Sequence, residues 1–259
     1  MNFINNKNIN VDKKMLEYKF YNQPTNFLKS EYKCIIPCDI YQTWYTKDLP
    51  EKMRERVNLL KSQNLNFNHY LFDDNDCREF IKTHFKQDVL HAYDSLIPGA
   101  YKADLWRLCV LFINGGIYLD IKLVCLNGFR LIELTEQNHF VKDRPADSIF
   151  NSLIASQKGN VFLFRAIRQI VKNVNNKYYG SSPLSPTGPE LLGKIAIRTN
   201  FEGVNIDLQH YNGGGYIIYK NRFVISTEYP EYNNERTNTY NNINTKRYDK
   251  LWHEKAIYA

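Results

Sequence analysis

The segment YKADLWRLCVLFINGGIYLDIKLV, residues 101–124, decides the fold. Residues 101–113 carry apolar side chains around the whole circumference of a helix, which predicts a helix buried on all sides. The NGG at 114–116 predicts the end of this helix, because glycine readily adopts the left-handed backbone angles of a helix C-terminus. Side chains alternate along 117–124, which predicts a strand with Asp120 towards its carboxyl end. A helix followed so closely by a strand is typical of an α/β domain.

Two charged residues lie on the predicted buried helix. Asp104 and Arg107 are three positions apart and are therefore neighbours on one face. A buried charge needs a partner, since the loss of that partner costs about 3 to 5 kcal/mol. The pair is either an internal salt bridge that positions the helix or a pair directed at a polar ligand in a cleft. The sequence leaves both interpretations open.

A second pair of charges follows on the predicted strand, where Tyr118, Asp120 and Lys122 share one face. Two carboxylates at the spacing of Asp120 and Lys122 would indicate a metal and phosphate site, but here one group is acidic and the other is basic. As an alternative, Asp120 caps a turn or pairs with Lys122, which is the commoner role for such a residue.

Strands and helices alternate through the first half of the chain. Periodicity and capping residues predict strands at 34–44 and 68–74 and helices at 49–63, 73–85 and 87–96. The acidic run at 73–76 lacks the glycine and the later glutamate of a calcium loop, so we predict that it caps a helix. Strands separated by helices indicate a mostly parallel central sheet flanked by helices, with ligands at the carboxyl ends of its strands.

The second half of the chain is less regular. Its pattern predicts helices at 160–174 and 190–199, a loop at 178–189 and a hairpin at 215–226. The tail at 228–258 is too aromatic to be plain disorder, so we expect a lid that closes with a docked Trp252. No repeat or linker stands out, which favours a single domain at 35–259 after an N-terminal extension at 1–34.

The bulk composition is that of a globular protein. With 259 residues, 43% of them hydrophobic, the chain is long enough to bury a core. The five cysteines form no C-x-x-C pair and the six histidines do not cluster, so a zinc site has little support and a reducing compartment is expected. The N-terminus lacks the apolar core of a signal peptide, and no run approaches a membrane span of about 20 residues. We therefore expect a soluble cytoplasmic protein without a transmembrane segment, located in the host cytoplasm or the virion if its source is viral.

The net charge of +7 suits an anionic partner. The lysines and arginines are scattered, however, and form no continuous basic block. A basic nucleic-acid-binding protein stays open as an alternative, because 19 tyrosines and 15 phenylalanines can stack on bases. No recognised nucleic-acid-binding motif occurs, so nucleic acid is not the expected partner.

Four segments of the chain form a set: IPCDIYQTW at 36–44, YLFDD at 70–74, YKADLWRLCVLFINGGIYLD at 101–120 and PTGPELL at 186–192. Together they resemble the family 32 glycosyltransferases, whose hallmark is a D-x-D sugar-nucleotide motif. That family includes the fungal initiating mannosyltransferases of the Golgi and is similar, at the same motifs, to the glucosylating domains of large clostridial toxins. The resemblance implies a GT-A-like fold. It also implies transfer of a hexose-type sugar, with retention at the anomeric carbon, from a nucleotide-diphosphate donor to a glycan or another hydroxyl acceptor.

The resemblance assigns roles to single residues. Asp104 and Arg107 match the acid and the arginine that hold the donor sugar and its phosphate, and together with Asp120 they are the expected catalytic residues. Asp120 matches the first acid of the D-x-D motif, near the ribose or a metal ion. Trp44 lies where the family places residues beside the nucleotide base, and a tryptophan packed under the first loop is an equal alternative.

Three further residues complete the expected donor site. Tyr118 shares the face of Asp120, and Thr187 and Gly188 belong to the matching PTGPELL segment. For Thr187 and Gly188, helix capping ahead of a proline in the first turn is the alternative interpretation. The NGGGY run at 212–216 is favoured as a flexible turn over a phosphate loop. Within the domain, the half at 35–130 is expected to hold the nucleotide sugar, and the half at 131–259 to hold the acceptor and supply the lid.

Lys122 departs from the family, which usually has a second acid there, the stronger metal ligand. An ammonium ~4 Å from a divalent cation is repelled by roughly 8 kcal/mol at an effective dielectric near 20. Either Lys122 offsets the diphosphate charge itself and transfer needs no metal, or Lys122 swings away while Asp120 and a tail group such as His253 hold manganese or magnesium. A third hypothesis is a chain that binds sugar nucleotides or glycans without turnover.

Overall fold

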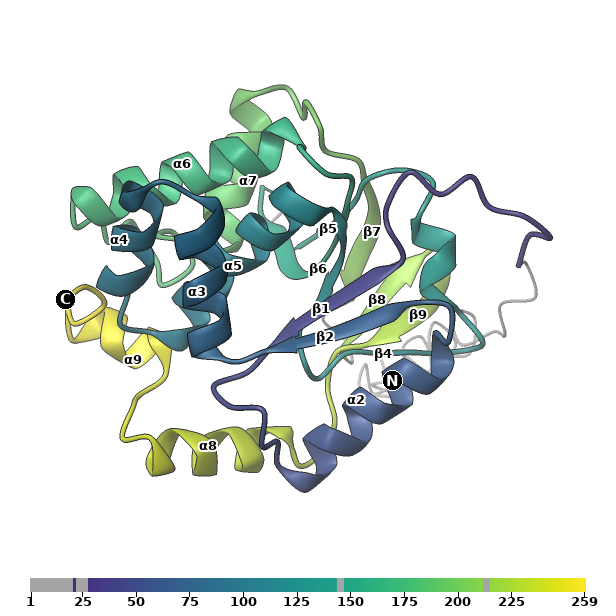
Figure 1. The fold of residues 1–259 in the computed structure, drawn as a ribbon, viewed down its shortest axis with the longest axis horizontal. Coiled ribbons are helices and arrows are strands. Elements are labelled where there is room, and N and C mark those ends of the chain that lie inside the picture. Colours follow the sequence, from purple (N-terminus) through teal and green to yellow (C-terminus); the bar gives the residue numbers. More distant parts are fainter. Residues whose placement is uncertain (1–20, 22–27, 144–146, 212–214) are drawn as a thin grey trace, which may run out of the picture.

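A nine-stranded sheet flanked by helices runs through the residues that the computed structural model describes, which are 21, 28–143, 147–211 and 215–259 (Figure 1). The strands are β1 (Asp39–Thr43), β2 (Asn68–Phe72), β3 (Gly116–Leu119), β4 (Val124–Cys125), β5 (His139–Lys142), β6 (Ile149–Ser156), β7 (Ile206–Tyr211), β8 (Tyr216–Tyr219) and β9 (Arg222–Ser226). The helices are α2 (Glu51–Gln63), α3 (Asp74–His84), α4 (Gln87–Ser95), α5 (Gly99–Asn114), α6 (Val161–Asn175), α7 (Pro189–Arg198), α8 (Tyr232–Asn242) and α9 (Tyr248–His253), with a 3-10 helix η1 (Leu131–Leu134). The predicted α/β class is confirmed.

The prediction of a mostly parallel sheet is wrong, because the sheet is mixed. Its order is β2-β1-β3-β6-β5-β7-β8-β9-β4, and among these strands β1–β2, β1–β3 and β5–β7 are the parallel pairs. The other neighbouring pairs are antiparallel. Strands β5, β6 and β7 were not predicted. Strand β5 is joined to β6 by a short connection, and only antiparallel neighbours can be joined so closely.

Helix α5 is buried on all sides, as predicted. Leu105, Trp106 and Cys109 have no exposed surface. The helix gives way to β3 through Gly116, where φ is 103° and a Cβ atom would lie 2.7 Å from the carbonyl oxygen of Asp39 in β1. Glycine at this position therefore lets β3 pair with β1 directly after the helix.

Strand β3 separates two hydrophobic cores. Tyr118 belongs to the core that α3, α4, α5 and α6 cover, whereas Ile117 and Leu119 belong to the core on the other face, which includes Leu60 of α2. The predicted alternation of side chains is therefore confirmed for this part of the chain.

The strand predicted at 117–124 breaks after Leu119, which corrects the placement of Lys122. A turn follows, and the backbone N–H of Leu123 donates to the carbonyl of Asp120 at 2.9 Å. Beyond the turn, β4 pairs with β9 instead of continuing β3. Lys122 thus lies in a turn and does not alternate with Tyr118 along one strand.

Two local predictions are confirmed by hydrogen bonds and backbone angles. Asp73 and Asp76 form a reciprocal capping box at the start of α3. Strands β8 and β9 form the predicted hairpin, and both residues of its turn, Lys220 and Asn221, have positive φ values of 48° and 58°.

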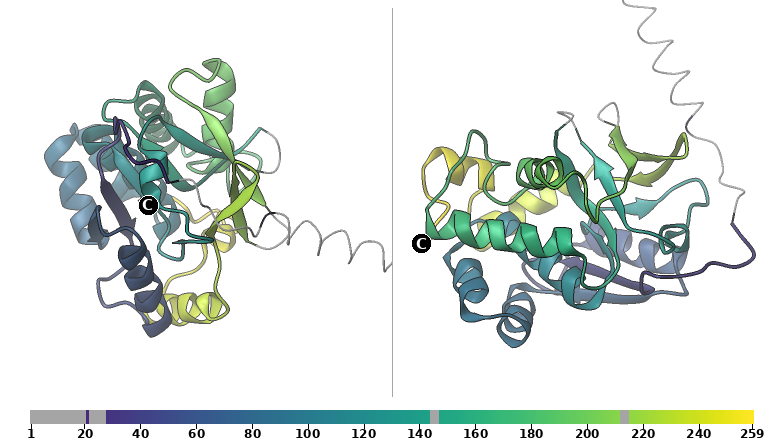
Figure 2. Two further views of the ribbon diagram at one scale, coloured as in Figure 1. Left: turned by 90° about the vertical axis from the view of Figure 1, so that its right-hand side faces the viewer. Right: turned by 90° about the horizontal axis from the view of Figure 1, so that it is seen from above.

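The C-terminal tail forms two helices, drawn in yellow in Figure 1, with α8 beside the start of α2 and α9 near α5. The indole N–H of Trp252 donates to the carbonyl of Tyr179 at 2.7 Å, so the predicted docking of Trp252 is confirmed. Figure 2 shows these two helices, again in yellow, from two further directions.

Some predictions fall outside the described residues. Most of the extension at 1–34 does, and so do residues 212–214 of the NGGGY run. Within the described part of the chain, no helix combines the length and the apolar character needed to cross a lipid bilayer.

Candidate active site

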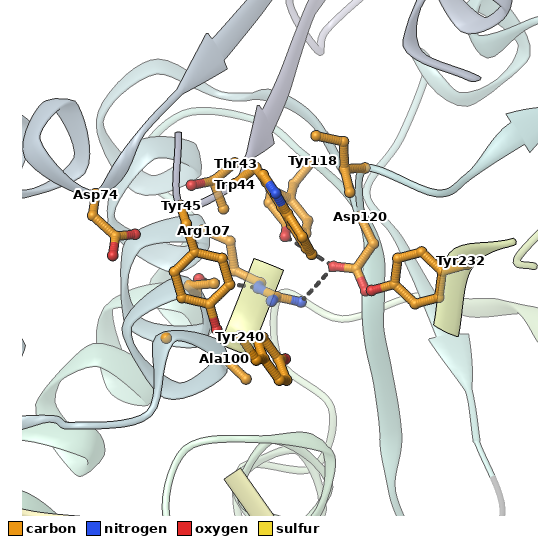
Figure 3. A pocket seen from close by; sticks show the side chains of 13 residues that line it. Thr43, Trp44, Tyr45, Asp74, Ala100, Arg107, Tyr118, Asp120, Tyr232 and Tyr240 are labelled. Atoms are coloured by element: carbon orange, nitrogen blue, oxygen red, sulfur yellow. Dashed lines mark hydrogen bonds and ion pairs between the residues drawn. The ribbon is translucent and has the colours of Figure 1, made fainter. Parts of the chain in front are cut away.

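A pocket opens at the carboxyl ends of β1 and β3, where α5 and α8 also meet (Figure 3). The residues that line it are Thr43 at the end of β1, Trp44 and Tyr45 after it, Asp74 of α3, Gly99, Ala100, Ala103 and Arg107 of α5, Tyr118, Asp120 and Ile121, and Tyr232 and Tyr240 of α8. Five of these lining residues are aromatic, and we call this pocket the aromatic arm.

A second hollow adjoins the first. It shares Ala100, Arg107, Asp120, Tyr232 and Tyr240 with the aromatic arm. It adds the polar or charged side chains of Asp104, Lys122, Asp143, Asn151, Ser152, Arg236 and Arg247, together with Gly188 and other residues. We call it the polar arm. The shared residues make the two arms one cleft with an apolar and a charged end.

Arg107 stands where the two arms meet. Its Nη1 is 3.4 Å from Oδ1 of Asp120 (Figure 3). Its Nη2 is 3.3 Å from Oδ1 of Asp104. The guanidinium also donates to the carbonyl of Asn151 at 2.6 Å and lies 4.3 Å from the ring centroid of Tyr118. Burial alone would lower the pKa of Arg107, but Tyr118 and the two carboxylates raise it on balance. Arg107 is therefore a fixed, buried cation at the centre of the cleft.

Asp104 is tied to the protein through both of its carboxylate oxygens. Oδ1 accepts from the side-chain amide of Asn151 at 2.8 Å, and Oδ2 accepts from the hydroxyl of Thr187 at 2.7 Å. Burial raises the pKa of this carboxyl, and Arg107, Thr187 and Asn151 offset only part of the effect. Each carboxylate oxygen has two lone pairs, so the group can still accept a hydrogen bond from a ligand hydroxyl.

Asp120 is positioned by its backbone and by one neighbour. Its N–H donates to the carbonyl of Ser152 at 2.8 Å, and its own carbonyl accepts from the side chain of Gln42 at 3.3 Å. The hydroxyl of Tyr118 donates to its Oδ1 at 2.9 Å. Burial raises the pKa of Tyr118 well above its usual value, which keeps this hydroxyl a donor. The carboxylate is 26% exposed and faces the cleft.

Lys122 reaches the polar arm from the turn after β3. Its Nζ lies 4.9 Å from the ring centroid of Tyr232, and its backbone carbonyl accepts two hydrogen bonds from Arg56. Burial lowers the pKa of Lys122, and the nearby Arg236 lowers it further, whereas Asp120 and Glu228 raise it. Lys122 thus lies close to Asp120, and both residues follow the end of β3.

The structure brings most of the predicted residues to this cleft. Trp44 lines the aromatic arm with 8% of its surface exposed, and its indole nitrogen is buried without a hydrogen-bond partner. Gly188 lines the polar arm and is the N-cap residue of α7, with Pro189 in the first turn. Thr187 lies behind the wall, 1% exposed, where it supports Asp104. The capping interpretation therefore holds for Gly188, and Thr187 has a positioning role instead.

Sequence reasoning missed the residues that the tail and β6 contribute. Asn151 contacts both Asp104 and Arg107, and Tyr232, Arg236 and Tyr240 of α8 form one side of the cleft. The aromatic composition of the tail indicated a lid but gave no signal for these particular residues.

The side chains at the cleft do not fit a divalent metal ion well. Among the described residues, no group of three or more histidine, cysteine, aspartate or glutamate side chains is placed to hold one. Lys122 stands two positions after Asp120, where a D-x-D motif has its second acid. His253 is exposed on α9 and does not line either arm, so the structure does not bring it to Asp120.

Comparison with known proteins finds a family that matches this part of the chain. Residues 50–141 match the family described as "Glycosyltransferase sugar-binding region containing DXD motif". This match confirms the resemblance predicted from the sequence.

The chain is 29% identical over 187 residues to inositol phosphoceramide mannosyltransferase 3 of Schizosaccharomyces pombe, which covers 68% of this chain and 52% of that protein. It is also 29% identical over 213 residues to initiation-specific alpha-1,6-mannosyltransferase of Candida albicans, covering 67% and 54%. The chain thus spans about half the length of these relatives.

Among solved structures, the fold is similar to that of PaToxG Glycosyltransferase. The TM-score is 0.51 with 18% sequence identity, and the match covers 74% of this chain and 75% of the other. This likeness supports the GT-A-like architecture.

Proposed function

We propose that this protein is a retaining glycosyltransferase, since residues 50–141 match the glycosyltransferase sugar-binding region that contains the DXD motif. It transfers a hexose-type sugar from a nucleotide-diphosphate donor to a hydroxyl group of a glycan or another acceptor. The observation that carries the proposal is the convergence of Asp104, Arg107 and Asp120 on one cleft, with Arg107 within 3.4 Å of both carboxylates.

Each arm of the cleft suits one part of the donor. The aromatic arm offers Trp44 and Tyr45 to a nucleotide base, since an aromatic ring pairs well with a flat heterocycle. Asp120, at the border of the two arms, accepts from the ribose hydroxyls. The polar arm takes the diphosphate and the sugar, where Asp104 accepts from sugar hydroxyls and Arg107 and Lys122 face the phosphates. Tyr118 and Gly188 complete the donor site, and Thr187 keeps Asp104 in place.

In the proposed reaction, the bond between the anomeric carbon and the diphosphate oxygen breaks while a bond to the acceptor oxygen forms on the same face of the sugar. The proton of the acceptor hydroxyl passes to the departing diphosphate oxygen on that face. The departing diphosphate gains negative charge. Fixed cations that face this charge lower the barrier, because they need no reorganisation at the moment of reaction, and one well-placed group is worth about 3 to 4 kcal/mol. Arg107 is such a group, because it is buried and held by Asn151, Asp104 and Asp120.

We propose that Lys122 offsets the diphosphate charge, so that transfer proceeds without a divalent metal. The support is the donor set itself, in which Asp120 and Lys122 stand where two acids would otherwise hold a metal ion. The acceptor half, residues 131–259, supplies the rest of the polar arm and the lid. Because both relatives named above are described as mannosyltransferases, a mannose donor is the first to try.

The proposal is tested by calorimetric titration of the purified protein with uridine and guanosine diphosphate sugars, each with manganese and with chelator. Donor hydrolysis or transfer is then measured with the sugar nucleotide that binds. We expect one donor to bind and turn over in chelator. Binding without any turnover would favour a sugar-nucleotide-binding protein, and failure to bind any donor would contradict the proposal.

A further inference from the structure

Helix α8 brings a second cation to the side of Lys122. The guanidinium carbon of Arg236 lies 5.2 Å from the ring centroid of Tyr232, and Nζ of Lys122 lies 4.9 Å from the same centroid. Both residues line the polar arm, together with Arg107, Asp120 and Gly188. Two positive groups that are 114 positions apart in the sequence, at 122 and 236, thus gather around one tyrosine ring at the proposed phosphate end of the cleft.

The carboxylates of the polar arm already have other partners. Asp104 and Asp120 face Arg107, and Oδ1 of Asp143 lies 3.1 Å from Nδ1 of His210. In the described part of the chain, neither Lys122 nor Arg236 forms an ion pair with a carboxylate.

Not every N–H group of the Arg236 guanidinium has a hydrogen-bond acceptor. Its Nη2 donates to Oδ1 of the neutral Asn233 at 2.9 Å, and its Nε is buried without a hydrogen-bond partner. Burying a donor without an acceptor costs folding free energy. A ligand oxygen that accepts a hydrogen bond from this Nε would therefore bind more favourably.

We propose that Arg236 and Lys122 form a diphosphate subsite, in which the tail helix α8 supplies half of the positive charge that receives the β-phosphate of the donor. The inference rests on the proposed function and extends it to a residue that lies outside the matched region 50–141. The planar guanidinium of Arg236 can contact two phosphate oxygens at once, and the ammonium of Lys122 adds a point charge.

The electrostatics around Lys122 support this subsite. Burial lowers the pKa of Lys122, Asp120 and Glu228 raise it, and the neighbouring Arg236 lowers it by a smaller amount. An anion between the two cations would remove their mutual repulsion and favour the charged lysine. The subsite therefore selects a ligand with a second phosphate and needs no metal ion to bridge it.

The test is calorimetric titration in chelator with the nucleoside diphosphate and the nucleoside monophosphate of the base that the wild-type protein binds, uridine or guanosine. The variants are Arg236→Gln, Arg236→Lys and, as a matched loss of one positive charge from an exposed tail position, Lys250→Gln. We expect Arg236→Gln to weaken diphosphate binding roughly tenfold or more, the usual effect of losing a charged hydrogen bond. Monophosphate binding should change less than about twofold. Arg236→Lys should keep part of the diphosphate affinity, and Lys250→Gln should keep all of it.

The possible failures are distinguishable. If the wild-type protein binds the diphosphate and Arg236→Gln binds it equally well, the subsite is wrong while the proposed function stands. If Arg236→Gln weakens both nucleotides equally, Arg236 holds the cleft together and does not recognise the second phosphate, which also overturns the subsite. If the wild-type protein binds neither uridine nor guanosine nucleotides, the proposed function fails and the subsite fails with it.

Discussion

The hydroxyl of Thr187 donates a 2.7 Å hydrogen bond to Oδ2 of Asp104, although 83 positions of chain separate the two residues. The other oxygen of Asp104 faces Asn151 and Arg107. Asp104 is therefore a point where α5, β6 and the loop before α7 are tied together, and the same carboxylate lines the cleft. The two interpretations of Asp104 that the sequence left open, structural partner and ligand contact, do not exclude each other.

Asp104→Asn separates these two roles. We expect turnover to fall by roughly 100-fold or more, because the negative charge that faces the sugar is lost. The free energy of unfolding should fall by about 1 to 3 kcal/mol, since Arg107 loses one of its two carboxylates. Steady-state kinetics and chemical denaturation measure the two effects.

The control for Asp104→Asn is Thr187→Val, which removes one hydrogen bond but keeps the carboxylate. It should cost about 1 kcal/mol of stability and change turnover much less than Asp104→Asn does. If both variants lost activity to the same extent, Asp104 would act only by holding the cleft together.

Lys122→Asp restores the second acid of the D-x-D pattern. We expect the wild-type protein to be active in chelator, and we expect Lys122→Asp to lose that activity and regain it with manganese, because a carboxylate attracts the divalent cation that an ammonium repels. Lys122→Met, which offers neither charge, should be impaired under both conditions. Initial rates with and without manganese decide the question. A wild-type protein with a strict need for manganese would contradict the role proposed for Lys122.

Trp44→Phe tests the aromatic arm. Trp44 and Trp106 are both buried with unpartnered indole nitrogens, but only Trp44 lines the cleft. We expect nucleotide binding to quench the fluorescence of the wild type and of Trp106→Phe, and to quench that of Trp44→Phe much less. Affinity should fall by roughly fivefold in Trp44→Phe alone, which corresponds to a loss of about 1 kcal/mol of stacking. Equal quenching in both variants would place the base elsewhere.

Glu235→Gln tests which contacts hold the tail helix α8 against α2. Glu235 of α8 accepts hydrogen bonds from the backbone N–H groups of Lys52 and Met53 and from the hydroxyl of Tyr229, and the helix α2 has no side-chain cap of its own. A carboxylate at a helix N-terminus stabilises by about 1 kcal/mol. We therefore expect Glu235→Gln to lower stability by that order and to speed amide hydrogen exchange in α8.

Glu55→Gln is the control for this prediction, because it removes an exposed charge from α2 itself. It should leave exchange in α8 unchanged. Unchanged exchange in α8 of Glu235→Gln would show that the tail is held by other contacts.

Asp74→Asn gives a prediction about pH. Burial, assisted by Asp73 and opposed by Lys102, raises the pKa of Asp74 from 3.8 to about 6. The folded state therefore binds this proton more tightly than the unfolded state. Its stabilising contribution is complete below pH 3.8 and is lost as the pH rises to about 6.

We accordingly expect Asp74→Asn to be more stable than the wild type by about 1 to 2 kcal/mol at pH 7.5, and the difference to shrink towards zero at pH 4. Denaturant unfolding at the two pH values measures it, with the exposed Asp48→Asn as control. A difference that is the same at both pH values would rule out titration of Asp74 as the cause.

The first half of the fold was predictable because its signals are local. The periodicity of α2 and α5, the capping box of α3 and the glycines after α5 depend on residues within a few positions of one another. The same is true of the β8–β9 hairpin, whose turn needs two residues with positive φ. Strands β5, β6 and β7 were not predicted from the sequence, because packing decides which strands become their neighbours in the sheet. A strand pattern read along the chain does not show whether its neighbour is parallel or antiparallel.

The sequence by itself determined the buried helix α5, its exit through Gly116 into β3, and the presence of Asp104, Arg107 and Asp120 in a pattern typical of sugar-nucleotide enzymes. Only the tertiary structure decided that Lys122 sits in a turn beside Arg236, that Thr187 supports Asp104 from behind, and that Glu235 caps α2. The physical reason is that these contacts join segments far apart in the chain. Such contacts form only once the cores on both sides of the sheet have packed, and they leave no periodic trace in the sequence.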